Sequence, residues 1–504
     1  MDDQILKLQN GSDIRGVALE GVEGEHVNLT PAIANMIGQA FAQWLAVKTK
    51  KNADQLKIGV GMDSRISGQN LMVAVSAGII SQGADVQCCG LATTPAMFMS
   101  TVFEQSAFDG SVMITASHLP FNRNGIKFFD KDGGLEHEDI SQILEAARQK
   151  EERPVDVSEE KNFDLLYLYS QHLRGAIMNG VGDSQRPLEG LKIIVDAGNG
   201  AGGFFAEKVL EPLGADIEGS QFLEPDGRFP NHIPNPENKE AMQSIREAVL
   251  ASRADLGLIF DTDVDRMSAV LDDGSEINRD AIIAMISAIL APRNKGATII
   301  TDSVTSDRLT YFLERELGLV HLRYMRGYKN VINKQKELCA QGVNAPLAME
   351  TSGHGALKDN YFLDDGAFLA VQLVIALANA AKQGKKLQSL IEKLPPPGEE
   401  AELRFKINDE NFKEYGKNVL DTFAERAQDA GCIMPESFEG IRISFKGGPE
   451  ADGAEGWLLL RLSLHDPVMA LNIEGTTPDS LEKIKRTAAL LLQGFEKLDT
   501  SALD

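Results

Sequence analysis

The sequence contains few cysteines, few tryptophans and little positive charge. Its 504 residues include 4 cysteines and 2 tryptophans, and 50 Lys and Arg stand against 74 Asp and Glu, which gives a net charge of −24. So few cysteines in a chain of this length form no disulfide framework. The adjacent Cys88 and Cys89 fall in a strand-like segment where their side chains point to opposite faces, which favours buried thiols over metal ligands.

The acidic balance argues against a nucleic-acid partner and against an anionic membrane surface. An anionic substrate therefore needs positive charge that is concentrated locally, in a cleft. No apolar run reaches membrane-spanning length, and the first residues, MDDQILKLQNGSD, lack the basic and apolar regions of a signal peptide. With 43% hydrophobic and 25% charged residues, the composition is that of a soluble globular protein, which we expect in the cytoplasm.

Strands and helices alternate along the chain. Thr30 followed by Pro31 is typical of a helix start. We expect strands at 57–61, 86–89, 111–115, 192–196, 256–260, 298–301, 320–324 and 347–350, and helices at 70–81, 204–213 and 306–317. The turns at 83–86 and 214–217 share Gly-Ala-Asp, each before an expected strand, which suggests an internal repeat.

Two segments indicate domain boundaries. The charged stretch 150–160 is typical of a linker, and Pro395-Pro-Pro-Gly398 is the clearest boundary. Beyond it we expect strands at 441–445 and 457–463 and a final amphipathic helix at 480–498. The pattern predicts three similar α/β domains with mixed sheets at 1–155, 156–275 and 276–395, followed by a smaller α+β domain at 396–504.

The first chemical loop follows the apolar run at 112–114. This run predicts a buried strand that leads into a loop with Ser117 and His118, and Pro120 keeps the loop from continuing as regular structure. A serine presented beside a histidine, with Lys127 shortly behind, can carry a covalent group. Serine and histidine alone are more often a polar turn at the end of a strand. The functional interpretation of this loop therefore depends on the other chemical loops.

The second loop places three carboxylates directly after the apolar strand at 256–260. Asp261, Asp263 and Asp265 lie so close in sequence that their charges are costly unless a cation lies among them. Ligation by oxygen alone favours Mg²⁺ or Ca²⁺ over zinc. An EF-hand loop is the rival interpretation, but its sixth position requires glycine and is Arg266 here, and a strand precedes it. A solvated acidic turn is the other alternative.

The third loop, Met349-Glu350-Thr-Ser352-Gly-His354, also follows an apolar run. Its carboxylate, hydroxyl and imidazole are groups that bind neighbouring sugar hydroxyls. A helix-capping segment would have a similar sequence. Asp364-Asp-Gly366 shortly afterwards is expected to support the loop structurally.

The fourth loop begins with Arg461 and Ser463 at the end of an expected strand. A guanidinium fork and a hydroxyl can bind a dianionic phosphate. A strand edge with ordinary exposed polar groups is about as good an interpretation of these two residues alone.

Together and in this order, the four loops resemble those of the α-D-phosphohexomutase family, which includes phosphoglucomutases, phosphomannomutases and phosphoglucosamine mutases. The resemblance covers the whole chain. It rests on the family's phosphoserine loop at 115–127, its Mg²⁺ loop at 261–266 and its sugar-recognition loop at 350–354. Weaker markers agree, namely Asp13-Ile-Arg15-Gly16, Asp63-x-Arg65-x-Ser67-Gly68, Thr94-Pro95, Pro225-Asp-Gly-x-Phe-Pro230 and Gly327-Tyr-Lys329. The resemblance implies a four-domain heart shape with a central cleft.

Three departures from the family pattern stand out. Leu119 replaces the usual asparagine and Thr262 the usual glycine. The fourth loop of the family reads Arg-x-Ser-x-Thr-Glu-Pro, whereas Leu464-His-Asp466 stands here in place of its small-residue core. We therefore expect a phosphate affinity or preference that differs from that of typical members.

The resemblance implies a phosphohexomutase that interconverts hexose 1-phosphate and hexose 6-phosphate, of glucose and/or mannose, through a phosphoserine and a bisphosphorylated sugar that also serves as activator. Ser117 would carry the phosphate and, with Asp261, Asp263 and Asp265, hold one Mg²⁺ per chain. Lys127 is the implied general acid/base with His118 as the alternative, and Arg15 and Arg266 would neutralise the phosphate. The residues implied in substrate binding are Arg266, Gly327, Lys329, Glu350, Ser352, His354, Arg461 and Ser463.

Two alternatives remain open. The first is a phosphoglucosamine mutase, since Thr351 occupies the variable position of the sugar loop. The second is a non-catalytic phosphosugar-binding protein of the same fold, which the altered fourth loop would suit. The chain is expected to act as a monomer or homodimer, and the sequence does not decide the preferred sugar.

Overall fold

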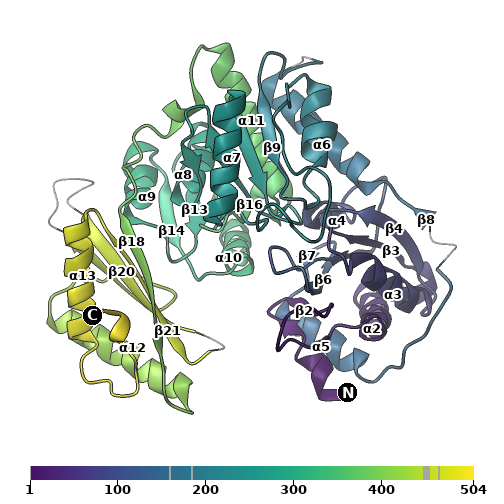
Figure 1. Ribbon diagram of the computed structural model, residues 1–504, viewed down its shortest axis with the longest axis horizontal. Coiled ribbons are helices and arrows are strands. Elements are labelled where there is room, and N and C mark those ends of the chain that lie inside the picture. Colours follow the sequence, from purple (N-terminus) through teal and green to yellow (C-terminus); the bar gives the residue numbers. More distant parts are fainter. Residues whose placement is uncertain (1, 158–160, 183–184, 447–453, 464–465, 504) are drawn as a thin grey trace. The chain divides into compact units, whose positions relative to one another are not determined.

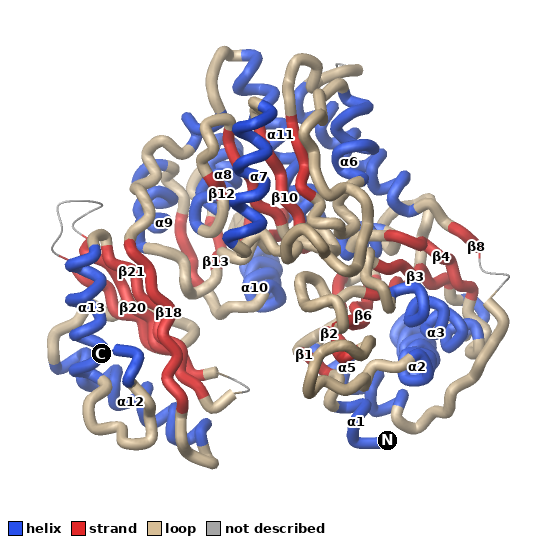
Figure 2. The backbone as a smooth tube through the Cα atoms, viewed as in Figure 1, coloured by secondary structure: helices blue, strands red, loops and turns tan. Residues whose placement is uncertain are grey.

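The computed structural model describes residues 2–157, 161–182, 185–446, 454–463 and 466–503. The chain forms two compact units (Figure 1). The first comprises Met1–Asn278, Ser352–Gly355 and Leu363–Leu387, and the second comprises Arg279–Thr351, Ala356–Phe362 and Gln388–Asp504. Helices and strands alternate through most of the chain (Figure 2).

The first sheet of the first unit has eight strands. They are β1 (Gln9–Asn10), β2 (Asp13–Val17), β3 (Lys57–Met62), β4 (Asp85–Leu91), β5 (Gly110–Ile114), β6 (Arg123–Asp130), β7 (Gly133–Gly134) and β8 (Lys161–Asn162). The order is β1-β2-β6-β5-β3-β4-β8, with β7 beside β6. β3 is parallel to β4 and β5, whereas β6 is antiparallel to β5 and β2, so the sheet is mixed, as expected.

Two helices of this domain pack backbone against backbone. The helices are α1 (Asp2–Leu6), α2 (Pro31–Thr49), α3 (Gly68–Ile80), α4 (Thr94–Met99) and α5 (His137–Ala147), with a short 3₁₀ turn at Ala53–Gln55. Thr30 caps α2 by accepting a hydrogen bond from the Ile33 amide, as the sequence predicts. A Cβ at Gly78 would lie 2.1 Å from the carbonyl oxygen of Asn35. Glycine is required there because α3 approaches the backbone of α2 directly.

The second sheet of the first unit has the order β12-β11-β10-β9. Its strands are β9 (Ile193–Asp196), β10 (Leu256–Phe260), β11 (Met267–Leu271) and β12 (Glu276–Ile277), and its helices are α6 (Leu165–Val181) and α7 (Lys239–Ser252). The helix expected at 204–213 is a π-helix at Phe205–Leu210 followed by a 3₁₀ turn at Glu211–Leu213 that contains a proline. The strand expected after Gly214 is wrong, because the segment forms only isolated bridges such as that of Lys192 with Asp216.

The second unit contains a parallel sheet in which β14, β13 and β15 are neighbours. Its elements are α8 (Asp280–Leu290), a 3₁₀ turn (Ala291–Arg293), β13 (Thr298–Thr301), α9 (Asp307–Tyr311), a π-helix (Phe312–Glu316), β14 (Val320–Arg323), α10 (Tyr328–Ala340), β15 (Leu347–Met349), β16 (Gly355–Leu357) and a 3₁₀ turn (Lys358–Asn360). The helix expected at 306–317 also contains a π-helix, which follows α9. β17 (Leu363–Asp364) and α11 (Gly366–Lys382) belong to the first unit.

An antiparallel sheet with the order β18-β21-β20-β19 closes the chain. Its elements are a 3₁₀ turn (Leu387–Leu390), β18 (Glu399–Lys406), α12 (Phe412–Asp429), β19 (Ile441–Lys446), β20 (Ala454–Leu462), β21 (Val468–Gly475), α13 (Pro478–Leu491) and a 3₁₀ turn (Ser501–Leu503). Side chains of α12, α13 and all four strands form one apolar core. The final helix ends at Leu491 rather than at 498. Among the described helices, none is long and apolar enough to cross a membrane.

Candidate active site

Ser117 lies on the loop that follows β5, which is fully buried. Its side chain is only 4% exposed, and its backbone φ of 48° is left-handed. Ser117 Oγ donates a hydrogen bond of 2.8 Å to Asp261 Oδ2 and lies 3.3 Å from His118 Nδ1. The structure therefore brings the first and second chemical loops into direct contact.

The three carboxylates at the end of β10 converge. Oxygen atoms of Asp261, Asp263 and Asp265 all lie within 4.8 Å of one another, and the three side chains are buried. Asp263 Oδ1 and Asp265 Oδ1 are buried without a hydrogen-bond partner among the described residues. Buried carboxylate oxygens without donors suit a cation that prefers oxygen ligands.

Two neighbouring segments fix the backbone of this acidic loop. A Cβ at Gly200, in the glycine-rich loop after β9, would lie 2.7 Å from Thr262 Cα. Thr94, at the start of α4, donates its amide to the carbonyl of Asp263 and its hydroxyl to Asp263 Oδ2 at 2.5 Å. The conformation of the acidic loop is therefore set by contacts on both sides.

The pKa values of Asp261 and Asp265 shift in opposite directions. Burial, followed by the charges of Asp265 and Asp263, raises the pKa of Asp261 well above its ordinary value. Burial also works against the charge of Asp265, but Lys127, His354 and Arg266 outweigh it and lower the pKa of Asp265. Unequal pKa values in one cluster are typical of functional sites.

Lys127 on β6 supplies a positive charge to this cluster. Its Nζ donates to Asp265 Oδ2 at 2.7 Å and to Asp263 Oδ2 at 3.4 Å. The Lys127 side chain is only 6% exposed. The ammonium group of Lys127 is therefore buried against the carboxylates of Asp263 and Asp265.

Arg266 and His118 complete the surroundings of Ser117. Arg266 Nη2 donates to Ser117 Oγ at 3.1 Å and to His118 Nδ1 at 2.5 Å. Burial and the positive charges of Arg266, His354 and Arg15 lower the pKa of His118 to about 3. His118 is therefore neutral at ordinary pH.

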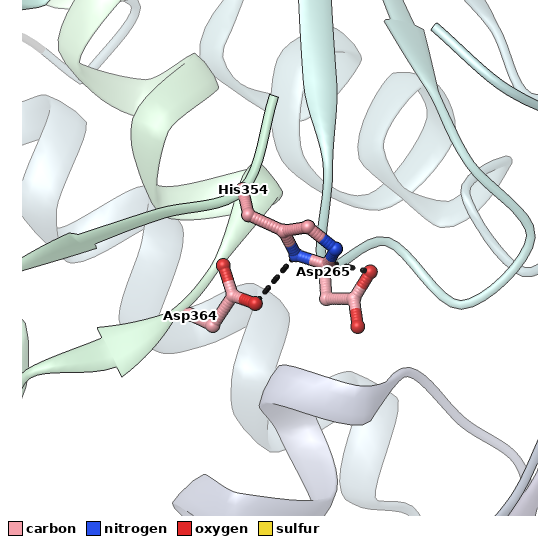
Figure 3. Close-up of side chains that lie close together, drawn as sticks. All are labelled: Asp265, His354 and Asp364. Atoms are coloured by element: carbon pink, nitrogen blue, oxygen red, sulfur yellow. Dashed lines mark ion pairs between the residues drawn. The ribbon is translucent and has the colours of Figure 1, made fainter. Parts of the chain in front are cut away.

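His354 comes from the third loop and joins the same cluster (Figure 3). Its Nδ1 lies 2.6 Å from Asp364 Oδ2 and 3.9 Å from Asp265 Oδ1. Burial opposes the charge on His354, but Asp364 and Asp265 outweigh burial and raise its pKa. Asp364 also accepts the amide of Gly355 at 2.9 Å, so it supports the loop as expected and in addition orients the imidazole.

Arg15, on β2, contacts the serine loop through the loop's backbone. Its guanidinium donates to the carbonyl of Thr115 at 3.3 Å and to Asp13 Oδ2 at 3.0 Å. Arg15 thus contacts the backbone of the serine loop just before the serine.

A cavity of about 540 Å³ opens beside the serine loop. His118, Leu119, Phe229, Ile233 and Glu237 are among the residues that line it. Its volume lies in the range of sites for small molecules.

In the second unit, Glu350 follows β15 and accepts the amide of Gly327 through Oε1 at 2.7 Å. The motif of Gly327 and Lys329 is therefore attached to the sugar loop through Gly327. Thr351 donates its hydroxyl to Asp302 Oδ2 at 2.8 Å. Burial, opposed chiefly by the charge of Arg326, raises the pKa of Asp302 to about 6. Ser352 belongs to the first unit, and its hydroxyl is buried without a described hydrogen-bond partner.

The fourth loop is already paired with a carboxylate. Arg461 Nη1 donates to Glu439 Oε1 at 2.8 Å, and Glu439 Oε2 accepts Ser303 Oγ and the amide of Arg326. Ser463 Oγ accepts the amide of Asp466 at 3.2 Å. Residues 464 and 465, where the sequence departs from the family pattern, lie outside the described residues. Sequence reasoning missed Glu439, because no pattern links it to Arg461.

Comparison with known proteins gives three matching domain families in chain order. They are "Phosphoglucomutase/phosphomannomutase, alpha/beta/alpha domain I" at residues 6–154, domain II at 168–274 and domain III at 278–397. Phosphomannomutase/phosphoglucomutase of Pseudomonas putida is 30% identical over 475 residues, which are 94% of this chain and 92% of that protein. Phosphoglucosamine mutase of Ruminiclostridium cellulolyticum is 31% identical over 495 residues, which are 96% of this chain and 98% of that protein.

The fold agrees with these sequence matches. The crystal structure of a phosphoglucomutase/phosphomannomutase family protein from Burkholderia thailandensis superposes with a TM-score of 0.76 at 26% identity and covers 98% of both chains. The three matched α/β domains and the additional C-terminal sheet of this chain agree with the fold of that family. Three domain families matched in order, and relatives matched over nearly the whole chain, place this chain in the phosphoglucomutase/phosphomannomutase family of α-D-phosphohexomutases.

Proposed function

We propose that this protein is an isomerase that interconverts hexose 1-phosphate and hexose 6-phosphate, with glucose and/or mannose phosphates as substrates. The observation that carries the proposal is the 2.8 Å hydrogen bond from Ser117 Oγ to Asp261 Oδ2, which puts a nucleophilic hydroxyl against three carboxylates. Ser117 carries a phosphate, and the reaction passes through a bisphosphorylated sugar that also serves as activator.

Mg²⁺ is the proposed cofactor, one ion per chain. Asp261, Asp263 and Asp265 would hold it together with an oxygen on Ser117. The two buried carboxylate oxygens without donors, on Asp263 and Asp265, support this assignment. When bound, the ion withdraws negative charge from the phosphoryl group during transfer.

The residues around Ser117 suit phosphoryl transfer, which needs positioning and charge neutralisation more than covalent help. The bond from phosphorus to Ser117 Oγ breaks while a bond from phosphorus to a sugar hydroxyl oxygen forms. Arg266, at 3.1 Å from Ser117 Oγ, neutralises the transferred group. Arg15, held near Thr115, contributes positive charge to the same loop.

Lys127 is the group we propose to exchange the proton of the sugar hydroxyl. As the neutral amine it would accept that proton when the sugar is phosphorylated, and as the ammonium it would return the proton in the reverse direction. His118 is the alternative, but its Nδ1 already accepts from Arg266, and its pKa of about 3 makes it a weak base. These two facts favour Lys127.

The remaining loops are proposed to hold the sugar and its second phosphate. His354, oriented by Asp364, and Ser352 would bind sugar hydroxyls together with Glu350, Gly327 and Lys329. Arg461 and Ser463 would bind the phosphate that is not being transferred. We further propose that the protein acts in the cytoplasm as a monomer or homodimer.

A phosphoglucosamine mutase is the second candidate. Its support is the relative of that name from Ruminiclostridium cellulolyticum, which is 31% identical over 96% of this chain. Thr351, the variable residue of the sugar loop, is held by Asp302 and does not discriminate between the candidates.

One experiment separates these candidates. The purified protein is assayed with the 1-phosphates of glucose, mannose and glucosamine, and intact mass spectrometry tests for a single phosphate. Ser117→Ala should lose both the phosphate and all activity, whereas the control Ser111→Ala, which removes a buried hydroxyl bonded to the Met97 carbonyl, should retain both. Full activity of Ser117→Ala removes the covalent step. Turnover of glucosamine phosphate alone selects the second candidate, and no turnover with a bound phosphosugar selects a binding protein.

A further inference from the structure

The sequence motif at residues 63–68 has no part in the proposed chemistry, yet Arg65 contacts the serine loop along most of its length. Its guanidinium donates hydrogen bonds to the carbonyl oxygens of Ser117, Leu119 (2.5 Å), Pro120 (2.8 Å) and Arg123 (2.9 Å). The remaining nitrogen, Nε, forms an ion pair with Asp63 at 3.4 Å. Both terminal nitrogens of the guanidinium are therefore committed to backbone carbonyls, and Nε faces Asp63.

A second motif supports this guanidinium from the other side. The ring centroid of Phe229 lies 5.3 Å from Arg65 Cζ. A Cβ at Gly227 would lie 2.5 Å from the Ile66 nitrogen and 2.6 Å from the Ser64 oxygen, so the loop at 225–230 packs directly on the backbone around Arg65. The two weak sequence markers thus meet around one buried side chain, which is 2% exposed.

The backbone of Ser117 has a conformation that needs such support. Its φ of 48° lies in the left-handed region, which residues other than glycine, asparagine and aspartate rarely adopt. The Ser117 amide donates to Thr115 Oγ1 at 2.9 Å, and the Ser117 carbonyl accepts from Arg65. The backbone amide and carbonyl of Ser117 are therefore both hydrogen-bonded, and its side chain donates to Asp261.

We propose that Arg65 is a positioning residue that holds the Ser117 loop in the conformation needed for phosphoryl transfer. The inference rests on the proposed function and adds what fixes the geometry of the phosphate-carrying serine. Arg65 acts through backbone carbonyls. Attacking and leaving oxygens must be nearly in line, so a displacement of about 1 Å costs about 100-fold in rate.

Three variants test the proposal. Arg65→Lys keeps the charge, but its single ammonium nitrogen cannot reach four separate carbonyls. The second variant combines Asp63→Asn with Arg65→Met. Arg65→Met alone leaves the buried Asp63 carboxylate, whose pKa burial already raises to about 6, without its ion-pair partner, so both charges are removed together. The control is Arg426→Met, since Arg426 also donates to two carbonyls, those of Leu491 and Gln493, and lies over a phenylalanine ring.

Both variants at residue 65 should lower kcat about 100-fold and change KM for the hexose 1-phosphate by less than about threefold. Phosphorylation of Ser117 by a hexose 1,6-bisphosphate, followed by intact mass, should slow to the same degree. Backbone amides at 116–124 should exchange hydrogen faster than in the wild type. Arg426→Met should change none of these values.

A folded Arg65 variant with wild-type kcat and wild-type exchange at 116–124 overturns the inference, and so does a change confined to KM. If the double variant does not fold, Arg65→Lys decides alone. Failure of the proposed function is distinguishable, because the wild type then accepts no phosphate and converts no substrate. In that case hydrogen exchange in the Arg65 variants still decides whether the guanidinium orders the loop.

Discussion

Replacing Asp261 by asparagine is expected to stabilise the metal-free protein while it abolishes activity. Asp261 is fully buried, and burial with the charges of Asp265 and Asp263 raises its pKa well above the ordinary 3.8. At pH values between 3.8 and the raised pKa of the folded state, Asp261 keeps a proton that it releases in the unfolded chain. The free energy of unfolding therefore falls by about 1.4 kcal/mol for each pH unit in this window.

The amide of Asp261→Asn has no proton to lose, so this dependence disappears. Over each pH unit of this window the wild type loses about 1.4 kcal/mol through this group, and the variant loses none. The asparagine oxygen still accepts the hydrogen bond from Ser117. Thermal unfolding in EDTA at several pH values measures the difference, which should grow as pH rises. The control is Asp409→Asn, because the hydrogen bond from Lys497 lowers the pKa of Asp409 and the variant should be no more stable than the wild type.

Added Mg²⁺ should reverse the order of stability. At about 100 times its dissociation constant, a ligand that binds only the folded state stabilises it by about 2.7 kcal/mol. The wild type should gain this increment and Asp261→Asn should gain little, with its mutase activity lost. The reasoning is refuted if the variant unfolds at a lower temperature than the wild type in EDTA and still responds to Mg²⁺.

Three further changes test other parts of the structure. Tyr169→Phe removes a buried 2.6 Å hydrogen bond to Asp365 Oδ1 and should cost about 1.5–3 kcal/mol in denaturant unfolding. Gly78→Ala places a Cβ 2.1 Å from the Asn35 carbonyl oxygen and should cost about 1–3 kcal/mol in the same measurement. Lys127→Met should lower kcat by about 100- to 10,000-fold in the coupled mutase assay if the ammonium transfers the proton.

Each of these has a matched control in the chain. Tyr167→Phe changes a tyrosine that is 54% exposed on the same helix, and an equal cost at both tyrosines would contradict the value assigned to the buried bond. Gly175→Ala meets no atom within 4 Å and should not destabilise the protein. Lys131→Met should leave kcat unchanged. A kcat for Lys127→Met close to that of Lys131→Met would remove the lysine from the proton transfer.

Local patterns predicted the strands that carry chemistry because each is a short apolar run bounded by polar residues. β5 and β10 are buried along their whole length, so their signal is strong. β18 was not predicted, since its sequence EEAELRFK is mostly charged and mostly exposed. β21 was also missed, although Met469, Leu471 and Ile473 alternate with more exposed residues. The π-helices could not be predicted, because an inserted residue leaves the apolar spacing nearly helical.

The chemical loops were recognisable from residue types, but their contacts were not. The sequence placed Asp261, Asp263 and Asp265 together because they are close in the chain. The partnership of His354 with Asp364 and that of Arg461 with Glu439 depend on the fold, since no spacing rule connects them. Arg65 belongs to a motif that was noticed, but four carbonyl acceptors carry no sequence signal at all. The bounds of the four domains stay a prediction.

The ion pair between Arg461 and Glu439 has a consequence for turnover. Under the proposed function, an incoming phosphate has to replace the Glu439 carboxylate that pairs with Nη1 of Arg461, so the observed affinity is the difference between two attractions. The same carboxylate can return when the phosphate departs, so the partly buried charge of Arg461 keeps a partner. In the proposed cycle, such an exchangeable contact binds anions and also releases the bisphosphorylated sugar easily.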